Sequence, residues 1–292
     1  MGDQFDVIES GTSGRRRWAG IAVLVALVAV PVVGILVSRE PQALPAPRPT
    51  PTPVPSLTTV ANPPNVLHAK PRGKGGDEVI EVVFPHGVRA EVRYPAALAL
   101  DELGARPFQG VWVGGQYRFL VAPYAGEFEI TRGGQPIRSL TPNVTLWSGL
   151  PGSGPNAQVL LFAFGRWRLA MYDQPGELTF EQRLAVAEGL RGKVVGDGYV
   201  VLSAKGGARL AAPGETVQGV PVGPQLWFGG GAGETLMLIP TPHCRPAAVM
   251  SAAPGRPGRP AKAVCRGGVG VVASGPDRFV KQALQGIRIT LK

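Results

Sequence analysis

Hydrophobic and polar positions divide the chain into an apolar run, a proline-rich stretch and a long region of short alternating segments. Residues 18–37 read WAGIAVLVALVAVPVVGILV and contain no charged side chain. At about 1.5 Å per residue this run spans roughly 30 Å, the thickness of the hydrocarbon core of a bilayer. It therefore predicts one transmembrane helix. Arg15, Arg16 and Arg17 directly before it favour a cytosolic N-terminus.

A cleaved signal peptide is the alternative, because its charged and apolar parts have the same pattern. The segments 36–38 and 44–46 both carry leucine where a small residue should precede the cleavage site, which favours a retained anchor. Residues 1–17 are then a cytosolic tail too short to fold. In both cases everything after the apolar run is expected outside the cytosol, at the cell membrane.

Residues 38–77 are rich in proline and glycine and predict a linker. In residues 41–64, proline at alternate positions favours polyproline II, which rises about 3.1 Å per residue. This arm could reach roughly 70 Å and would hold the following region away from the membrane.

Residues 78–292 predict an α+β extracytoplasmic domain built on antiparallel sheet, with two or three helices. Short runs with period-two alternation or continuous apolar character predict its strands. They are VIEVVF (79–84), GVRAEVRY (87–94), RFLVA (118–122), GEFEITR (126–132), AQVLLFAF (157–164), RWRLAMYD (166–173), GYVVLSA (198–204), ARLAA (208–212), ETLMLIP (234–240), GVGVVAS (268–274) and GIRITLK (286–292). The glycines between 228 and 234 predict a hairpin turn. No repeat stands out, and a division into two subdomains near residue 175 stays open.

Three segments predict helices. AALALDELG (96–104) follows a proline and ends at a glycine, and TFEQRLAVAEGLRG (179–192) carries apolar residues at helical spacing. Thr179 and Gln182 are placed to form a capping box at the start of the second segment. Ser274 and Asp277 are placed to cap a last helix, DRFVKQALQ (277–285).

The charge is unbalanced, with 30 Lys and Arg against 20 Asp and Glu, a formal net charge of +10. Such an excess favours attraction to anionic surfaces such as lipid head groups or acidic wall polymers. A generally basic, solvated surface is the alternative. We expect no specific recognition of nucleic acid.

The two cysteines, Cys244 and Cys265, lie after the apolar run and are expected to form a structural disulfide. The segment that they enclose, with its flank, is the densest basic stretch in the chain and contains no acid. Its cations could hold phosphate or carboxylate groups, so they form the predicted binding site, although a solvated hairpin loop is the alternative. These residues are Arg245, Arg256, Arg259, Lys262 and Arg266.

Sequence patterns for catalysis are missing, so we expect no catalytic residue, no metal site and no cofactor. His243 beside Cys244 has no second ligand at metal-binding spacing. The acids that could pair for glycoside cleavage are expected on the surface; they are Glu127, Glu129, Asp173 and Glu177. Four tryptophans are expected in the core, with exposed binding platforms as the alternative; they are Trp112, Trp147, Trp167 and Trp227.

Residues 165–204 combine a tryptophan-containing strand, a turn, a helix and a further strand. This segment resembles a pattern in extracytoplasmic domains of membrane-bound anti-sigma and envelope-stress proteins of bacteria. The matching positions are Trp167, Thr179, Glu181, Gln182 and Leu184. The resemblance implies a location on the envelope side. Sigma-factor binding is not implied, because the short tail holds no anti-sigma domain. The arginine-flanked anchor and proline-rich stalk also resemble single-pass membrane proteins of actinobacteria.

The leading hypothesis is a membrane-anchored extracytoplasmic binding or sensory module for a protein partner or an anionic envelope polymer. One alternative is an extracytoplasmic hydrolase of cell wall or carbohydrate. Another is a structural assembly factor of a membrane complex.

Overall fold

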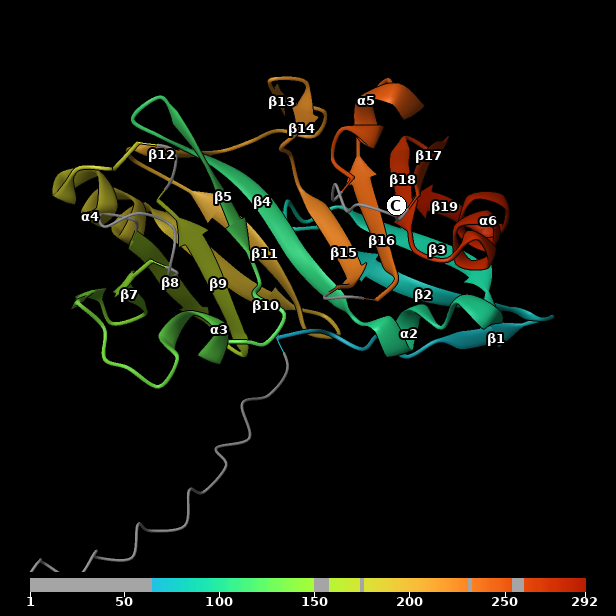
Figure 1. The fold of residues 1–292 in the computed structure, drawn as a ribbon, viewed down its shortest axis with the longest axis horizontal. Helices are drawn as coiled ribbons and strands as arrows, with labels where there is room; N and C mark the ends of the chain where they lie inside the picture. The colour runs from blue at the N-terminus through green and yellow to red at the C-terminus, as the bar shows by residue number, and fades with distance from the viewer. Residues whose placement is uncertain (1–64, 150–157, 174–175, 231–232, 254–259) are drawn as a thin grey trace, which may run out of the picture. The chain divides into compact units, whose positions relative to one another are not determined.

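Antiparallel strands form most of the structure, which is a computed structural model describing residues 65–149, 158–173, 176–230, 233–253 and 260–292 (Figure 1). The predicted sheet-rich α+β class is confirmed at this level. Within these residues no helix is long and apolar enough to cross a bilayer. The expected tail (1–17), transmembrane helix (18–37) and most of the linker lie outside the described residues.

The largest sheet contains eleven described strands, all paired antiparallel, in the order β17-β18-β16-β15-β4-β5-β9-β8-β7-β6, with β12 added alongside β4. Their bounds are β4 Ala105–Val113, β5 Gln116–Val121, β6 Arg138–Thr141, β7 Val144–Ser148, β8 Gln158–Phe164, β9 Trp167–Tyr172, β12 Ala208–Leu210, β15 Gln225–Gly229, β16 Thr235–Pro240, β17 Ala261–Arg266 and β18 Val269–Ser274. The predicted hairpin turn after residue 228 is confirmed, since β15 and β16 pair directly.

A second layer lies behind the large sheet in Figure 1 and covers its inner face. It consists of a four-stranded sheet in the order β1-β2-β3-β19 and a β10–β11 hairpin. The bounds are β1 Arg72–Lys74, β2 Asp77–Val83, β3 Arg89–Pro95, β10 Leu190–Val195, β11 Tyr199–Ala204 and β19 Arg288–Leu291. The main core fills the space between the layers, with Ile80 and Val92 from one and Phe162, Leu169 and Leu236 from the other. A small separate hairpin joins β13 (Thr216–Val217) to β14 (Val220–Pro221).

Two ten-residue helices, α4 (Phe180–Gly189) and α6 (Asp277–Gly286), lie at opposite ends of the large sheet (Figure 1). The capping box of Thr179 and Gln182 is confirmed, because each side chain bonds the backbone N–H of the other residue. The predicted cap of the last helix is wrong. Ser274 ends strand β18, and the residue preceding α6 is Pro276, which makes no side-chain cap.

The remaining helices are short. The segment predicted as a helix over 96–104 forms a 3₁₀ turn, η1 (Ala96–Leu98), and one α-turn, α2 (Leu100–Leu103). The predicted strand GEFEITR (126–132) is wrong, because it contains helix α3 (Phe128–Thr131). Its period-two alternation does not match burial, since Phe128 is 58% exposed and Ile130 alone enters the core. Helix α5 (Pro246–Met250) was not predicted.

The ordered domain begins before residue 78. Val66, Leu67 and Ala69 are buried, and Leu67 pairs with Ala105 at the start of β4. Asn65 donates to the carbonyls of Pro123 and Arg168, which fixes the entry of the chain against β9. Three buried apolar side chains within five residues explain why this segment packs despite its prolines and glycines.

The order of elements occurs twice, although no repeat was apparent in the sequence. The first half runs β3, hairpin β4–β5, hairpin β8–β9, α4 and β10, and the second runs β11, hairpin β15–β16, hairpin β17–β18, α6 and β19. In the large sheet, β4-β5-β9-β8 leads outward from one side of the β4–β15 junction and β15-β16-β18-β17 from the other. The last strand of each half pairs with the first strand of the other, β10 with β11 and β19 with β3.

Sequence similarity between the halves becomes visible once the structure aligns them. VWVGGQYRFLVAP (111–123) corresponds to LWFGGGAGETLMLIP (226–240), with Trp112 matching Trp227. Each long helix ends in a glycine, Gly189 or Gly286, followed by an apolar residue and an arginine. The domain is therefore an internal duplication whose two halves exchange their last strands.

Candidate binding face

A row of aromatic side chains crosses the outer face of the large sheet. Trp227 on β15, Phe108 on β4, Phe119 on β5 and Tyr172 on β9 stand next to one another, with ring centroids 5.1, 6.4 and 5.1 Å apart. They share a face because alternate residues of a strand point the same way and the strand register brings them together. The row lies on both sides of the β4–β15 junction, where the two halves meet.

The rings of the row are nearly parallel, with interplanar angles of 7°, 11° and 24° between neighbours. Their faces therefore cover one another. Phe108 is buried, and the other three rings are partly buried, so ring edges form the part left at the surface. Burial, with the negative charge of Glu129 nearby, raises the pKa of Tyr172 to about 12, so the row is uncharged at neutral pH.

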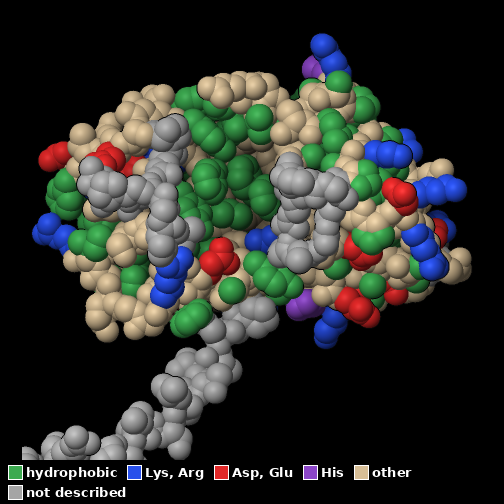
Figure 2. Space-filling model, viewed as in Figure 1, with side chains coloured by type: hydrophobic (Ala, Val, Ile, Leu, Met, Phe, Trp, Pro, Cys, Tyr) green, Lys and Arg blue, Asp and Glu red, His purple; other side chains and the backbone are tan. Residues whose placement is uncertain are grey.

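Two smaller apolar clusters flank the row on the same face. One contains Ile130 of α3 with Trp147 and Ala170, and the other contains Met237 with Val249 of α5. Figure 2 shows hydrophobic side chains gathered at the centre of this face. The row with its flanking clusters is called the aromatic face below.

A pocket of about 700 Å³ opens between strand β5 and the β13–β14 hairpin. Its apolar lining comes from Tyr117, Val217, Val220 and Val222. Its polar lining comes from Gln116, Arg118, Gly176 and Gln218. Pockets of this size with mostly apolar walls and a few polar groups are typical of small-molecule sites.

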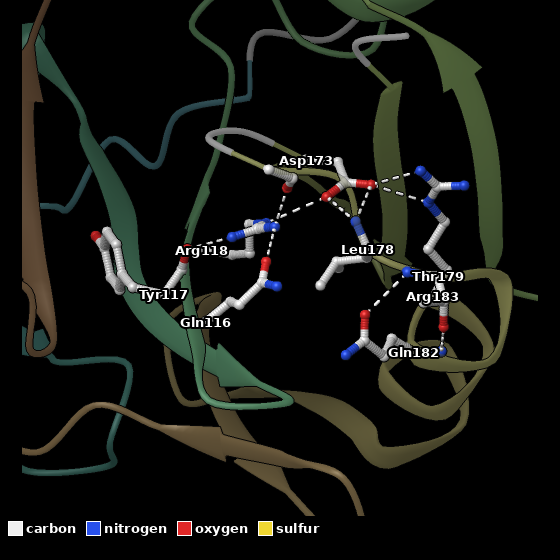
Figure 3. A network of polar contacts seen from close by, with 9 residues as sticks. Gln116, Tyr117, Arg118, Asp173, Leu178, Thr179, Gln182 and Arg183 are labelled. Atoms are coloured by element: carbon white, nitrogen blue, oxygen red, sulfur yellow. Dashed lines mark hydrogen bonds and ion pairs between the residues drawn. The ribbon is translucent and has the colours of Figure 1, made fainter.

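A buried charged network lies behind the polar end of this pocket (Figure 3). Arg118 Nε donates to Asp173 Oδ1 at 3.2 Å, and Arg183 lies 2.7 Å from Asp173 Oδ2. The side chains of Arg118 and Asp173 are each 1% exposed. The backbone N–H of Leu178 also donates to both oxygens of Asp173. The carboxylate is therefore held by two guanidinium groups and one backbone N–H.

Arg118 also binds the wall of the pocket. It donates to Gln116 Oε1 and to the carbonyl oxygen of Tyr117, both at 2.7 Å, and to the carbonyl oxygen of Gly176. Gly176 lies in the segment before α4, so these bonds hold that segment against strand β5. The two positive charges and one negative charge leave the network with a formal charge of +1.

The duplicated half does not contain this network. Arg118 and Asp173 point toward the main core, because Leu120 and Met171, two residues away from them, do so. The corresponding inward-facing pairs between β16 and β18 are Leu236–Ala273 and Leu238–Val271, and all four side chains are apolar members of the main core. The same fold is thus built with apolar side chains, so the backbone arrangement alone does not require the buried ions.

Arg106 is a second buried arginine, on β4 opposite Trp227. It donates to the carbonyl oxygens of Ala122 and Gly229 and lies under the ring of Tyr124, 5.2 Å from the centroid. Burial lowers the pKa of its guanidinium. Its role is to join the ends of β5 and β15 beneath the aromatic face.

Glu215 connects the β13–β14 hairpin to the first tryptophan of the duplicated pair. It accepts from Arg209 and from Trp112 Nε1, at 2.8 and 2.7 Å. These bonds, led by Arg209, lower the pKa of Glu215 to about 2. Arg209 also stacks over the Trp112 ring, 5.5 Å from its centroid.

Three residues of the predicted basic site, Arg245, Lys262 and Arg266, are among the described residues. The predicted disulfide between Cys244 and Cys265 is present. On β17, Lys262 and Arg266 share one face and Cys265 points to the other. Cys265 is bonded to Cys244, and the exposed Arg245 directly follows Cys244. Arg266 donates to the carbonyl oxygens of Cys265 and Leu284. Arg256 and Arg259 lie outside the described residues.

Sequence reasoning placed some of these side chains wrongly. Asp173 was expected on the surface and is buried, because its partners Arg118 and Arg183 come from distant segments. Trp147 and Trp167 are core residues as predicted, but Trp112 and Trp227 are only partly buried. The repeated pattern of a tryptophan, one apolar residue and two glycines, at 112–115 and 227–230, is a sequence signal that could have identified the centre of this face.

Comparison with known proteins adds no assignment to this geometry. No protein-family profile, no curated protein and no solved structure matches the chain.

Proposed function

We propose that the chain is a membrane-anchored extracytoplasmic binding module whose aromatic face binds a protein partner. The observation that carries the proposal is the row of partly buried rings at the centre of this face (Figure 2). Contiguous apolar patches on a folded domain mark interaction sites, because covering them removes apolar surface from water.

The geometry of the row favours a protein over a polysaccharide. A sugar ring stacks on the face of an aromatic side chain, and here the faces are turned toward one another. Ring edges flanked by aliphatic clusters fit the mixed aliphatic and aromatic side chains of a protein surface. If this protein partner is a subunit of a membrane complex, the chain is a structural assembly factor of that complex.

The location belongs to the same proposal. Residues 18–37 would hold the chain in the membrane and the linker would carry the domain away from it. The disulfide supports this placement, because disulfides persist in oxidising compartments outside the cytosol.

The two other candidate functions have less support. An anionic polymer would have to bridge Lys262 and Arg266 on β17 and the exposed Arg245 before α5. Asp173, the acid of the network behind the pocket, has its oxygens occupied by two guanidinium groups. A carboxylate held in this way is a poor general base for the hydrolase alternative.

Co-purification of the full-length chain from native membranes tests the proposal. Tyr172→Glu places a charge in the row, and Val194→Glu places the same charge on β10 in the other layer. Val194 is 39% exposed and serves as the matched control. We expect a protein partner that is retained by the parent chain and by Val194→Glu and lost from Tyr172→Glu. Equal retention by both variants would show that the partner binds elsewhere.

A further inference from the structure

We propose that the pocket between strand β5 and the β13–β14 hairpin binds an aliphatic molecule that carries a carboxylate. This site is separate from the protein-binding row, because the two share no lining residue. The proposal therefore does not depend on the protein partner.

The apolar part of the ligand follows from the walls. Val217, Val220 and Val222 face Tyr117 across the pocket, and Val220 remains 39% exposed. An aliphatic chain would remove these side chains from water, at about 25 cal/mol for each Å² of apolar surface. The pocket volume of about 700 Å³ is that of a small-molecule site.

The carboxylate follows from the charge at the polar end. Arg118 and Arg183 supply two positive charges and Asp173 supplies one negative charge, all within a buried network. Gln116 and the carbonyl groups of Tyr117 and Gly176 contribute dipoles but no compensating charge. An anion at the end lined by Gln116 and Arg118 would neutralise the excess in a region of low dielectric constant.

The duplicated half supports a ligand role for this charge. The inward-facing pairs of β16 and β18, Leu236–Ala273 and Leu238–Val271, are apolar and buried without any ion. Burying a charged network gives no general gain in stability over neutral side chains. The charges are therefore best explained by a ligand that binds the pocket in the first half and has no counterpart in the second half.

Calorimetric titration of the full-length chain in lipid nanodiscs tests the proposal, with empty nanodiscs as the blank. The probes are octanoate, octanamide and octylammonium, which share one chain length and differ in the charge of the head group. We expect octanoate to bind about tenfold more tightly than octanamide, and octylammonium to bind most weakly. Equal affinity of octanoate and octanamide, tightest binding of octylammonium, or no binding by any probe would overturn the proposal.

Charge variants then test whether the network causes the preference for octanoate over octanamide, because opposite changes of charge should move the preference in opposite directions. Arg183→Gln lowers the charge of the network and should reduce the ratio of octanoate to octanamide affinity, whereas Asp173→Asn raises the charge and should increase it. Val220→Trp fills the pocket and should abolish binding of both probes, and Val194→Trp, at an equally exposed valine, should change neither. A ratio that moves in the same direction in the two charge variants would contradict the assignment even if Val220→Trp fails to fold.

Discussion

At the scale of the residue, the two buried arginines show how differently a charge can be held. Arg118 has a carboxylate partner, whereas the hydrogen bonds of Arg106 go to backbone carbonyls. Removing one member of a buried ion pair costs more than replacing the whole pair, because the remaining charge loses its compensation.

Asp173 is expected to be sensitive to substitution for this reason. Asp173→Ala leaves two guanidinium groups without their carboxylate and should lower the free energy of unfolding by about 3 kcal/mol, measured by denaturant titration. The double variant Arg118→Leu, Asp173→Ala copies the inward-facing pair Leu236–Ala273 of the other half and should cost less than the single variant. A double variant less stable than Asp173→Ala would contradict the equivalence of the two halves.

Glu215 makes stability depend on acid. Its pKa falls from the ordinary value of 4.5 to about 2 in the folded chain, so its contribution is complete above pH 4.5 and is lost as the pH falls toward 2. Glu215→Gln should lower stability by about 1 kcal/mol at neutral pH and flatten the loss between pH 4.5 and 2. Unfolding midpoints across this range measure the effect. A variant with the parent's acid dependence would show that Glu215 does not titrate as described.

Residue-level sequence reasoning succeeded where both partners lie close together in the chain or are unique in it. The capping box of Thr179 and Gln182 is local, and two cysteines allow one pairing. The burial of Asp173 was not predicted, because the two arginines that bind it are 55 and 10 residues away in the sequence. No local pattern distinguishes such an acid from a solvated one.

At the scale of the element, alternation predicted strands that have one buried face. β9 places Trp167, Leu169 and Met171 in the main core, as its pattern indicated. Strand β4 was not predicted. Nearly every residue in it is buried, so its sequence does not alternate between apolar and polar residues. The duplication was missed because different segments lie between matching elements, so the sequence has no fixed period.

The glycines that end α4 and α6 test the duplication. A Cβ atom on Gly189 would lie 2.3 Å from the carbonyl oxygen of Lys205, and one on Gly286 would lie 2.3 Å from Pro95 Cγ. Lys205 follows β11 and Pro95 ends β3, so both glycines meet the first strand of the opposite half. Gly189→Ala and Gly286→Ala should each lower stability by about 1–3 kcal/mol.

Thermal or denaturant unfolding measures these costs. Gly207→Ala is a suitable control, because its Cβ would have only ordinary contact, 3.5 Å from Ala185 Cβ, and its φ is not positive. Destabilisation by the control equal to that of the two helix-end variants would remove the steric explanation.

At the scale of the whole molecule, the exchanged strands and the continuous large sheet join the two halves, and the disulfide fastens one edge. Cys244 and Cys265 are separated by 21 residues and connect the start of α5 to β17. Replacing both by alanine should lower the free energy of unfolding by about 3 kcal/mol, because the unfolded chain regains the entropy of an open loop. Unchanged stability would mean that the loop is already constrained without the bond.

We expect the aromatic face, and not another surface, to contact the protein partner. Site-specific photo-crosslinking in intact cells tests this contact, with a photoreactive residue placed at Tyr172 in the row or at Val194 on the opposite layer. We expect one discrete crosslinked protein from position 172 and none from position 194. Crosslinking of the same protein from both positions, or from position 194 alone, would contradict it.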